Sequence, residues 1–166
     1  MRALVIVILA AVAIPPVATG ATSVSGFATG AFVQQEWDVY NLWVNTTRTI
    51  SLVVTWSDPF GPADLRRAED LSLSIYQPGV WDEKCRPERD PCAFVEPDDY
   101  YARSIGCPPF NNGMEGGFLP DVPAGRYHVV VEGNLGITVP YTLTTDYASL
   151  TYNITRAAGA VFVPPC

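Results

Sequence analysis

The stretch Trp37–Trp56 reads WDVYNLWVNTTRTISLVVTW and contains two alternating runs separated by a polar turn. In the second run the apolar residues Ile50, Leu52, Val54 and Trp56 fall on one face and Thr49, Ser51, Val53 and Thr55 on the other. A strand with one buried and one solvated face alternates in this way because successive side chains point to opposite faces. The stretch therefore predicts two β-strands joined by a turn at Asn45-Thr46-Thr47.

Four further runs show the same period of two. They span residues 71–76, 125–133, 138–147 and 149–155. Pro140 lies inside one of them and favours an edge strand or a bulge there, because proline has no N–H to donate to a neighbouring strand. No stretch has a convincing helical period. The pattern predicts an all-β fold, an antiparallel β-sandwich that is jelly-roll-like.

The chain begins with the pattern of a secretory signal peptide. Arg2 precedes an apolar run over residues 3–14, two prolines end that run, and small residues follow. The run is shorter than the ~20 residues of a permanent transmembrane helix. We therefore expect residues 1–21 to be removed, a single domain over residues 22–166, and a secreted, extracellular protein. An uncleaved anchor is the alternative.

Charge and sequons narrow the range of partners. The chain carries ten lysines and arginines against 17 acidic residues, a formal net charge of −7. A surface of that sign repels nucleic acid. Sequons begin at Asn45 and Asn153 and predict N-glycosylation at both, which fits export.

Residues 80–114 interrupt the strand pattern with a stretch rich in proline and charge. We expect a long loop insertion here, closed by disulfides, because four cysteines in an exported chain are typical of two disulfides. The wide cysteine spacings argue against a zinc site, which needs close pairs.

The pairing of the cysteines follows from loop length. Cys85 and Cys92 lie in one short segment that closes easily, which leaves Cys107 to pair with Cys166. The alternative pairs Cys92 with Cys107 and Cys85 with Cys166.

Five short motifs occur in a fixed order along the predicted strands. They are Asp38-x-Tyr40, Asp70-Leu71-x-Leu73 closing on Pro78-Gly79, Glu115, Ala124-Gly125-x-Tyr127 and Tyr141-x-Leu143. In this order they resemble the bacterial and archaeal pre-peptidase C-terminal domain family, over about residues 26–147. The resemblance implies an accessory β-sandwich of the kind that accompanies secreted proteases and other hydrolases.

The residue inventory argues against catalysis. His128 is the single histidine, and its place in mid-strand, opposite Tyr127 and Val129, favours a surface or sheet-face histidine over a catalytic base. Oxidised cysteines offer no thiol nucleophile. Acidic pairs such as Asp82-Glu83 are more typical of solvated charge than of a glycosidase. The sequence therefore predicts a protein that is not an enzyme.

Calcium is the one metal that the sequence suggests. Asp58, Asp64 and Asp70 lie close together in the chain, and calcium takes several carboxylate oxygens. The competing interpretation is that Asp58 and Asp70 cap turns. We therefore expect no cofactor other than a candidate calcium ion.

Aromatic residues on the insertion are the predicted binding residues. Trp81, Tyr100 and Tyr101 have side chains of the kind that stack on sugars or anchor a protein partner, whereas Trp37 and Trp43 are expected in the core. The sequence thus predicts a secreted, non-enzymatic binding or accessory domain for an extracellular glycan or protein. A structural module of an extracellular surface or filament is the alternative, and a hydrolase or an inhibitor of a secreted peptidase is a third.

Overall fold

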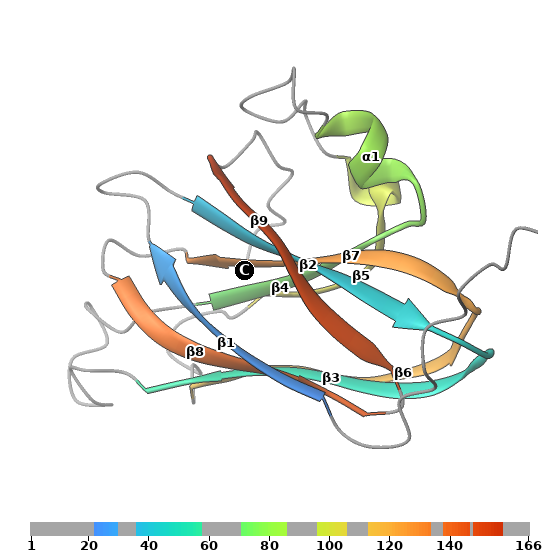
Figure 1. Cartoon of the computed structure of the whole chain (residues 1–166), viewed down its shortest axis with the longest axis horizontal. Helices are drawn as coiled ribbons and strands as arrows, with labels where there is room; N and C mark the ends of the chain where they lie inside the picture. The colour runs from blue at the N-terminus through green and yellow to red at the C-terminus, as the bar shows by residue number, and fades with distance from the viewer. Residues whose placement is uncertain are drawn as a thin grey trace, which may run out of the picture.

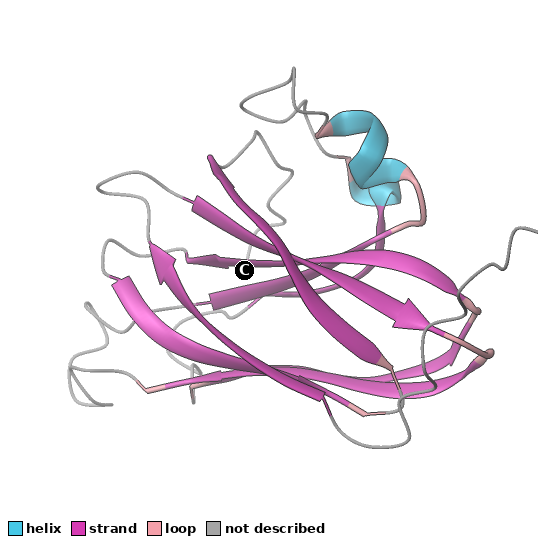
Figure 2. Ribbon diagram, viewed as in Figure 1, coloured by secondary structure: helices cyan, strands magenta, loops and turns pink. Residues whose placement is uncertain are grey.

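The computed structural model describes residues 22–29, 36–57, 71–85, 96–105, 113–133, 138–146 and 148–157. These residues form mostly strands (Figure 2). The elements are β1 (Thr22–Thr29), β2 (Glu36–Val44), β3 (Arg48–Trp56), β4 (Leu71–Tyr76), α1 (Val80–Lys84), the 3₁₀ helix η1 (Pro97–Asp99), β5 (Tyr100–Ile105), β6 (Met114–Val122), β7 (Gly125–Gly133), β8 (Thr138–Thr145) and β9 (Ser149–Ala157).

Two antiparallel sheets lie one above the other (Figure 1). Sheet A has the strand order β1-β8-β3-β6, and sheet B has the order β5-β4-β7-β2-β9. The first strand pairs with the eighth, the second with the seventh, the third with the sixth and the fourth with the fifth. This nested pairing is that of a jelly-roll sandwich, so the predicted all-β, antiparallel architecture is confirmed.

The main core fills the space between the sheets. Along β3 and β8 the buried residues alternate with more exposed ones, as the sequence pattern predicts. The most deeply buried core members include Leu42, Val54, Leu71, Val129, Val131, Val139 and Leu143. Each such side chain contributes on the order of 1.5–3 kcal/mol when it leaves water, so this interface supplies most of the stability.

The turn at residues 45–47 connects the two sheets. It follows β2, which belongs to sheet B, and precedes β3, which belongs to sheet A. The two strands of the Trp37–Trp56 stretch are therefore neighbours in sequence but lie in opposite layers of the sandwich.

The prediction of an edge strand at Pro140 is wrong. β8 lies between β1 and β3, and Pro140 pairs with Phe27 of β1. The ladder between β8 and β3 ends at the pair of Tyr141 and Trp56. Pro140 lies just beyond that end, so no residue of β3 needs a hydrogen bond from the N–H that proline lacks.

The predicted long loop over residues 80–114 is partly regular structure. Its described residues contain α1, η1 and β5, and β5 forms the edge of sheet B beside β4. Gly79 adopts φ = 85°, a left-handed conformation open to glycine, and this turns the chain from β4 into α1. The insertion therefore extends and covers sheet B.

A second apolar cluster lies on the outer face of sheet B. It consists of Trp37, Val39, Tyr76, Trp81, Cys85 and Val130, with Val80 and Tyr100 packed against it. We call α1, η1 and Tyr100 the cap, since they cover this face. Both faces of sheet B are thus buried over β4, all of whose residues are buried, and over most of β7. Residues 151–155 of β9 and Trp43 of β2 stay exposed.

Cys85 is the cysteine that lies within the described residues. Cys85 is buried and is not a free thiol, whereas Cys92, Cys107 and Cys166 lie outside the described residues, so the disulfide pairing stays a prediction.

Within the described ranges, no helix is long and apolar enough to cross a membrane.

Candidate functional site

Trp81, the first predicted binding residue, is a core residue of the cap. Its side chain is 4 % exposed. Its ring lies 5.3 Å from that of Tyr76, 6.1 Å from that of Trp37 and 5.9 Å from the imidazole of His128, centroid to centroid. The indole therefore covers sheet B and does not present a face to a ligand.

Tyr100 and Tyr101 point to opposite faces of sheet B. The Tyr100 ring packs 5.0 Å from that of Tyr76, with the Arg103 guanidinium 5.0 Å from its centroid, and burial raises the pKa of its hydroxyl. The Tyr101 ring packs 5.3 Å from that of Tyr127, against the main core. Both side chains are half-buried, so the predicted aromatic trio is not brought together into one exposed surface.

The other predicted site residues are placed as follows. Asp58, Asp64 and Asp70 lie outside the described residues, and within the described part no group of three or more potential metal ligands occurs. The sequon residue Asn45 is half-buried in the turn between β2 and β3, and Asn153 is exposed on β9. Trp37 is buried as expected, but in the cluster beneath the cap. Trp43 is 38 % exposed, so the expectation that it lies in the core is wrong.

His128 is enclosed between sheet B and the cap. It is 1 % exposed, and the ring of Trp81 stacks on it. Burial lowers the pKa of the imidazole below its ordinary value, partly opposed by Asp82, whose carboxylate lies 3.8 Å from Nε2. The prediction of a surface or sheet-face histidine is correct as to the sheet face and wrong as to the surface, because the cap covers that face.

Charged side chains gather on the cap side of the sandwich. Arg103 and Glu132 form an almost buried ion pair of 2.6 Å beneath the cap, and Lys84 pairs with Asp99 at 2.6 Å between α1 and η1. Asp82 of α1 pairs with Arg126 of β7. The Asp82–Arg126 pair thus joins the cap to sheet B, the Lys84–Asp99 pair joins the two helices of the cap, and the Arg103–Glu132 pair joins β5 to β7.

The outer face of sheet A has a different chemistry. We call it the hydroxyl face, after the serine and threonine side chains that point outward from three adjacent strands. They are Ser23 and Ser25 of β1, Thr138, Thr142 and Thr144 of β8, and Thr49, Ser51 and Thr55 of β3. The other outward positions with described side chains are Phe27, Pro140, Val53, Met114, Gly116, Phe118 and Pro120, and none of these is charged. Asp121, which is exposed at the register irregularity near the end of β6, adds one carboxylate to this face.

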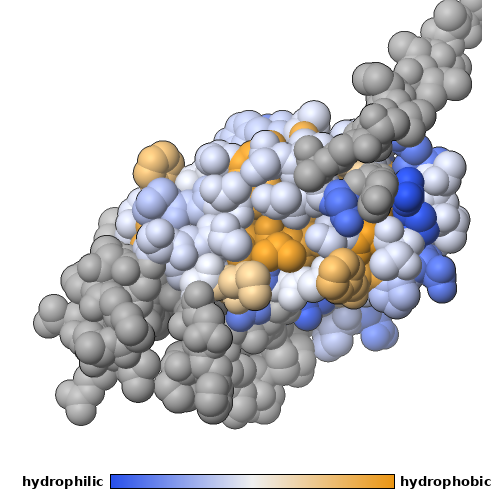
Figure 3. Space-filling view, turned by 90° about the horizontal axis from the view of Figure 1, so that it is seen from below, coloured by the Kyte–Doolittle hydropathy of each residue, from blue (hydrophilic) through white to orange (hydrophobic). Residues whose placement is uncertain are grey.

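Cross-strand register places these side chains in rows. Thr55 pairs with Thr142, and Thr142 pairs with Ser25, so three hydroxyl side chains stand side by side. The next row contains Val53, Thr144 and Ser23, and the Ser23 and Thr144 hydroxyls lie 3.3 Å apart. Figure 3 views the molecule from the side of sheet A: the ungreyed surface is mostly pale with separate apolar patches, and the most hydrophilic residues lie toward its margins.

A hollow of about 450 Å³ lies on the hydroxyl face beside Phe27. We call it the Phe27 hollow. Ser25, Thr55, Ser57 and Thr142 line it together with Phe27, Pro140 and Trp56. Phe27 is 69 % exposed, so its ring is available to a ligand in the hollow.

A buried hydrogen-bonded network supports the hollow from below. The Tyr141 hydroxyl donates to Oδ2 of Asp38 at 2.6 Å and lies 2.6 Å from the Tyr40 hydroxyl, while Thr155 donates to Oδ1 of Asp38 at 2.5 Å. Gly26 makes room for the two tyrosines, since a Cβ there would lie 2.8 Å from the Tyr40 hydroxyl and closer to that of Tyr141. Burial raises the pKa of both tyrosine hydroxyls, which stay protonated.

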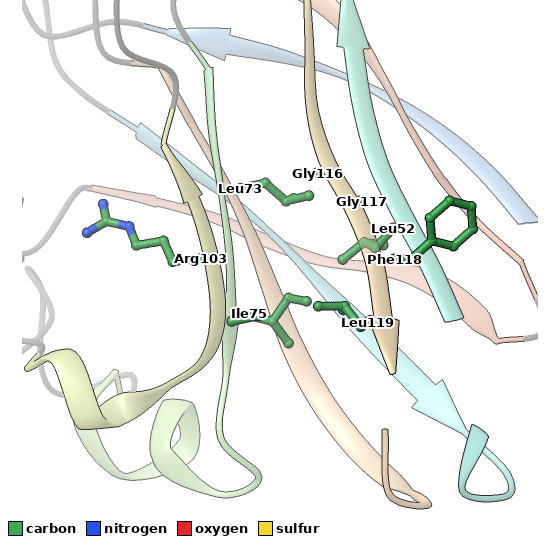
Figure 4. A pocket seen from close by; sticks show the side chains of 9 residues that line it. Leu52, Leu73, Ile75, Arg103, Gly116, Gly117, Phe118 and Leu119 are labelled. Carbon is green, nitrogen blue, oxygen red and sulfur yellow. The ribbon is translucent and has the colours of Figure 1, made fainter. Parts of the chain in front are cut away.

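A second cavity of about 270 Å³ opens between the edges of the two sheets. Leu52 and Leu119 from sheet A and Leu73 and Ile75 from sheet B point into it, while Phe118 and Arg103 point away (Figure 4). It is an apolar gap in the main core between β5 and β6, and its inward-pointing side chains offer no polar atom to orient a ligand.

Comparison with known proteins adds no relative. No protein-family model matches the chain, and no curated protein matches it.

The hydroxyl face is the feature that sequence reasoning missed. Its serine and threonine residues come from three strands that are separated in the chain by up to about 120 residues, and the strand order β1-β8-β3 is needed to bring them together. The available signal was the run of serines and threonines at the polar positions of two predicted strands, which fits any solvated sheet face.

Proposed function

We propose that this protein is a secreted, non-enzymatic binding module that uses the hydroxyl face. The observation that carries the proposal is the difference between the two outer faces. The cap covers the outer face of sheet B over β4, β7 and part of β2. Sheet A instead presents exposed or half-buried hydroxyl, aromatic and aliphatic side chains, with no charged residue among those that line the Phe27 hollow. Exposed apolar groups among polar ones are typical of an interaction surface.

The environment of His128 supports a role other than hydrolysis. A Ser-His-Asp or Cys-His mechanism needs a histidine that can exchange a proton with a nucleophile and substrate. The single histidine of the chain is buried against Trp81, and its Nδ1 has no hydrogen-bond partner. Such an imidazole is a packing group of the cap.

Export is supported by the sequence of the N-terminal segment and by Cys85. Residues 1–21 have the order of charges, apolar run and small residues that signal peptidases recognise. Cys85 is not a free thiol, and disulfides persist in oxidising compartments. The resemblance to pre-peptidase C-terminal domains agrees with an accessory module, and the candidate calcium ion of Asp58, Asp64 and Asp70 stays part of the proposal.

Matched lysine substitutions test the proposal. The mature protein is screened for saturable binding to immobilised glycans and extracellular matrix proteins, with Thr55→Lys on the hydroxyl face and Thr151→Lys at the exposed edge strand β9. We expect Thr55→Lys to weaken binding of whichever ligand is found and Thr151→Lys to leave it unchanged. No saturable ligand, or an equal effect of both substitutions, would refute the hydroxyl face as the binding surface.

A structural role is the second candidate, and exposed apolar residues on edge strand β9 favour it. Tyr152 is 57 % and Ile154 is 44 % exposed there. An edge strand with apolar side chains can pair with another chain. Concentration-dependent assembly that Ile154→Lys abolishes, in the absence of any ligand, would favour a structural module over a binding module.

A further inference from the structure

We propose that the Phe27 hollow binds an uncharged polysaccharide chain. The inference rests on the proposed function and names its ligand class. Its starting point is the hollow's size, about 450 Å³, and its lining of hydroxyl side chains and rings. Ligand sites of this size usually combine apolar walls with a few polar groups that fix orientation.

The polar groups of the hollow match the hydroxyls of a sugar. Ser25, Thr55 and Thr142 stand in one row across three strands. Each hydroxyl can accept hydrogen bonds and donate one, and that of Thr55 donates to the Thr142 carbonyl at 3.5 Å. A polyol offers the same mixture of donors and acceptors along its length. Hydroxyl groups on both sides can rotate to satisfy one another, so few polar atoms stay unpaired after water leaves.

The apolar groups of the hollow match the C–H faces of a sugar ring. Phe27 is 69 % exposed and pairs across the strands with Pro140, so two rings lie side by side at one wall. An aromatic ring gives a large, stiff contact area to an apolar surface at little entropic cost. Phe27 is therefore the side chain that we expect to stack on the ligand.

The distribution of charge around the hollow favours an uncharged ligand. The chain has a net charge of −7, yet none of the described residues that line the Phe27 hollow is charged. An anionic polymer would find no cationic side chain in this described lining and would be repelled by the net negative charge of the protein. A charged group that loses water without a partner pays a large desolvation cost, whereas a neutral polyol does not.

The floor of the hollow is held in place before a ligand arrives. Gly26 and Tyr141 line the hollow, and the Tyr141 hydroxyl is fixed by hydrogen bonds to Asp38 and Tyr40. A site that is already ordered loses less entropy on binding. The network beneath the hollow thus positions its walls.

The test uses two exposed phenylalanines of one sheet. Phe27 lines the hollow, whereas Phe118 is 80 % exposed on β6, at the opposite edge of sheet A and roughly 14 Å away across the strands. Wild type, Phe27→Ala and Phe118→Ala are compared for binding to insoluble cellulose, chitin and starch, and to the anionic polymers alginate and polygalacturonate. Because both side chains are exposed, thermal unfolding midpoints should match and show that each variant is folded.

We expect saturable binding to at least one neutral polysaccharide, weakened about tenfold or more by Phe27→Ala and less than about twofold by Phe118→Ala. Binding should persist between 50 mM and 500 mM NaCl, since no ion pair is made. Tighter binding to the anionic polymers, or equal effects of the two substitutions, would overturn the inference. Binding only to a protein, still lost in Thr55→Lys, would overturn the inference and leave the proposed function standing. Absence of any ligand would overturn both.

Discussion

The hydroxyl of Tyr141 in β8 donates a 2.6 Å hydrogen bond to Oδ2 of Asp38 in β2, and so joins the two sheets of the sandwich. Both residues are buried, and Tyr40 and Thr155 complete the network around them. The two motifs Asp38-x-Tyr40 and Tyr141-x-Leu143, which lie about 100 residues apart, thus meet at one point. A buried carboxylate is tolerated here because hydroxyls donate to both of its oxygens.

Removing the Tyr141 hydroxyl should destabilise the fold. Tyr141→Phe keeps the ring but takes a donor from a buried carboxylate, so we expect a loss of about 1–3 kcal/mol in the free energy of unfolding. Tyr152→Phe is the matched control, because the Tyr152 side chain is exposed and its hydroxyl contacts Thr155 without bonding to Asp38 itself, so its loss should cost less than that of the Tyr141 hydroxyl. The free energies of unfolding of wild type, Tyr141→Phe and Tyr152→Phe are measured in urea. Equal stabilities would mean that the network does not hold the sheets together.

A methyl group at Gly26 should disturb the same network from the opposite strand. Its Cβ would collide with the Tyr141 hydroxyl and approach that of Tyr40 to 2.8 Å. Overpacking of this kind costs about 1–3 kcal/mol, so Gly26→Ala should lower the urea midpoint. Gly117→Ala on β6 is the control, since nothing lies within 4 Å of a Cβ there. If both variants unfold together with wild type, the tyrosine pair can move aside freely.

The period-two pattern predicts β2, β3, β4, β7, β8 and β9, but it predicts which positions are buried only in strands with one solvated face. β3 and β8 are of this kind, and their buried and exposed positions follow the sequence. β6 is missed because Gly116, Gly117 and Pro120 interrupt its alternation, although Leu119 still packs against the core. Pairing between strands far apart in sequence supplies what local pattern lacks.

The sequence analysis does not predict the cap, because it assigns only one buried face to each strand. Val129, Val130 and Val131 are consecutive and all buried, with Val130 in the cluster beneath the cap and its neighbours in the main core. Such a continuous apolar run is typical of a strand covered on both faces. Trp37 and Val39 are likewise buried apolar residues on the outer face of sheet B. Apolar residues on that face need a cover, which indicates that an aromatic residue of the insertion packs on the sheet rather than binds a ligand.

The buried Arg103–Glu132 ion pair should contribute more to the free energy of unfolding than the exposed Asp82–Arg126 pair. Glu132→Ala leaves the Arg103 guanidinium in a nearly dry environment without its carboxylate partner, so we expect a loss of about 3 kcal/mol. Asp82→Ala removes an ion pair with Arg126 whose side chains are about half exposed, and should cost less than about 1 kcal/mol. Urea unfolding gives both values, and a larger loss for Asp82→Ala would contradict the role given to Glu132.

Acid should weaken the cap through His128. Burial against Trp81 lowers the pKa of the folded imidazole below the value of about 6.5 expected in the unfolded chain. The unfolded state therefore binds the proton first as the pH falls below about 6.5, and stability decreases in that direction. Above that pH both states are neutral and His128 has no effect. Unfolding at pH 7.5 and 5.5 should show a loss in wild type that is smaller in His128→Phe; an identical loss would exclude His128 as its source.

Disulfide mapping tests the arrangement of the cysteines around the cap. Cys85 follows α1 directly, is buried in the cluster beneath the cap and is not a free thiol. We expect non-reduced peptide mapping of the mature protein to find Cys85 joined to Cys92 and Cys107 joined to Cys166. By the chain-entropy account the short loop stabilises by about 2–3 kcal/mol and the long one by about 4–5 kcal/mol, so full reduction should lower the unfolding midpoint strongly. Replacing Cys107 and Cys166 together by serine should therefore cost more stability than replacing Cys85 and Cys92. Peptides joining Cys85 to Cys166 and Cys92 to Cys107 would show instead that the C-terminal segment is tied to the cap.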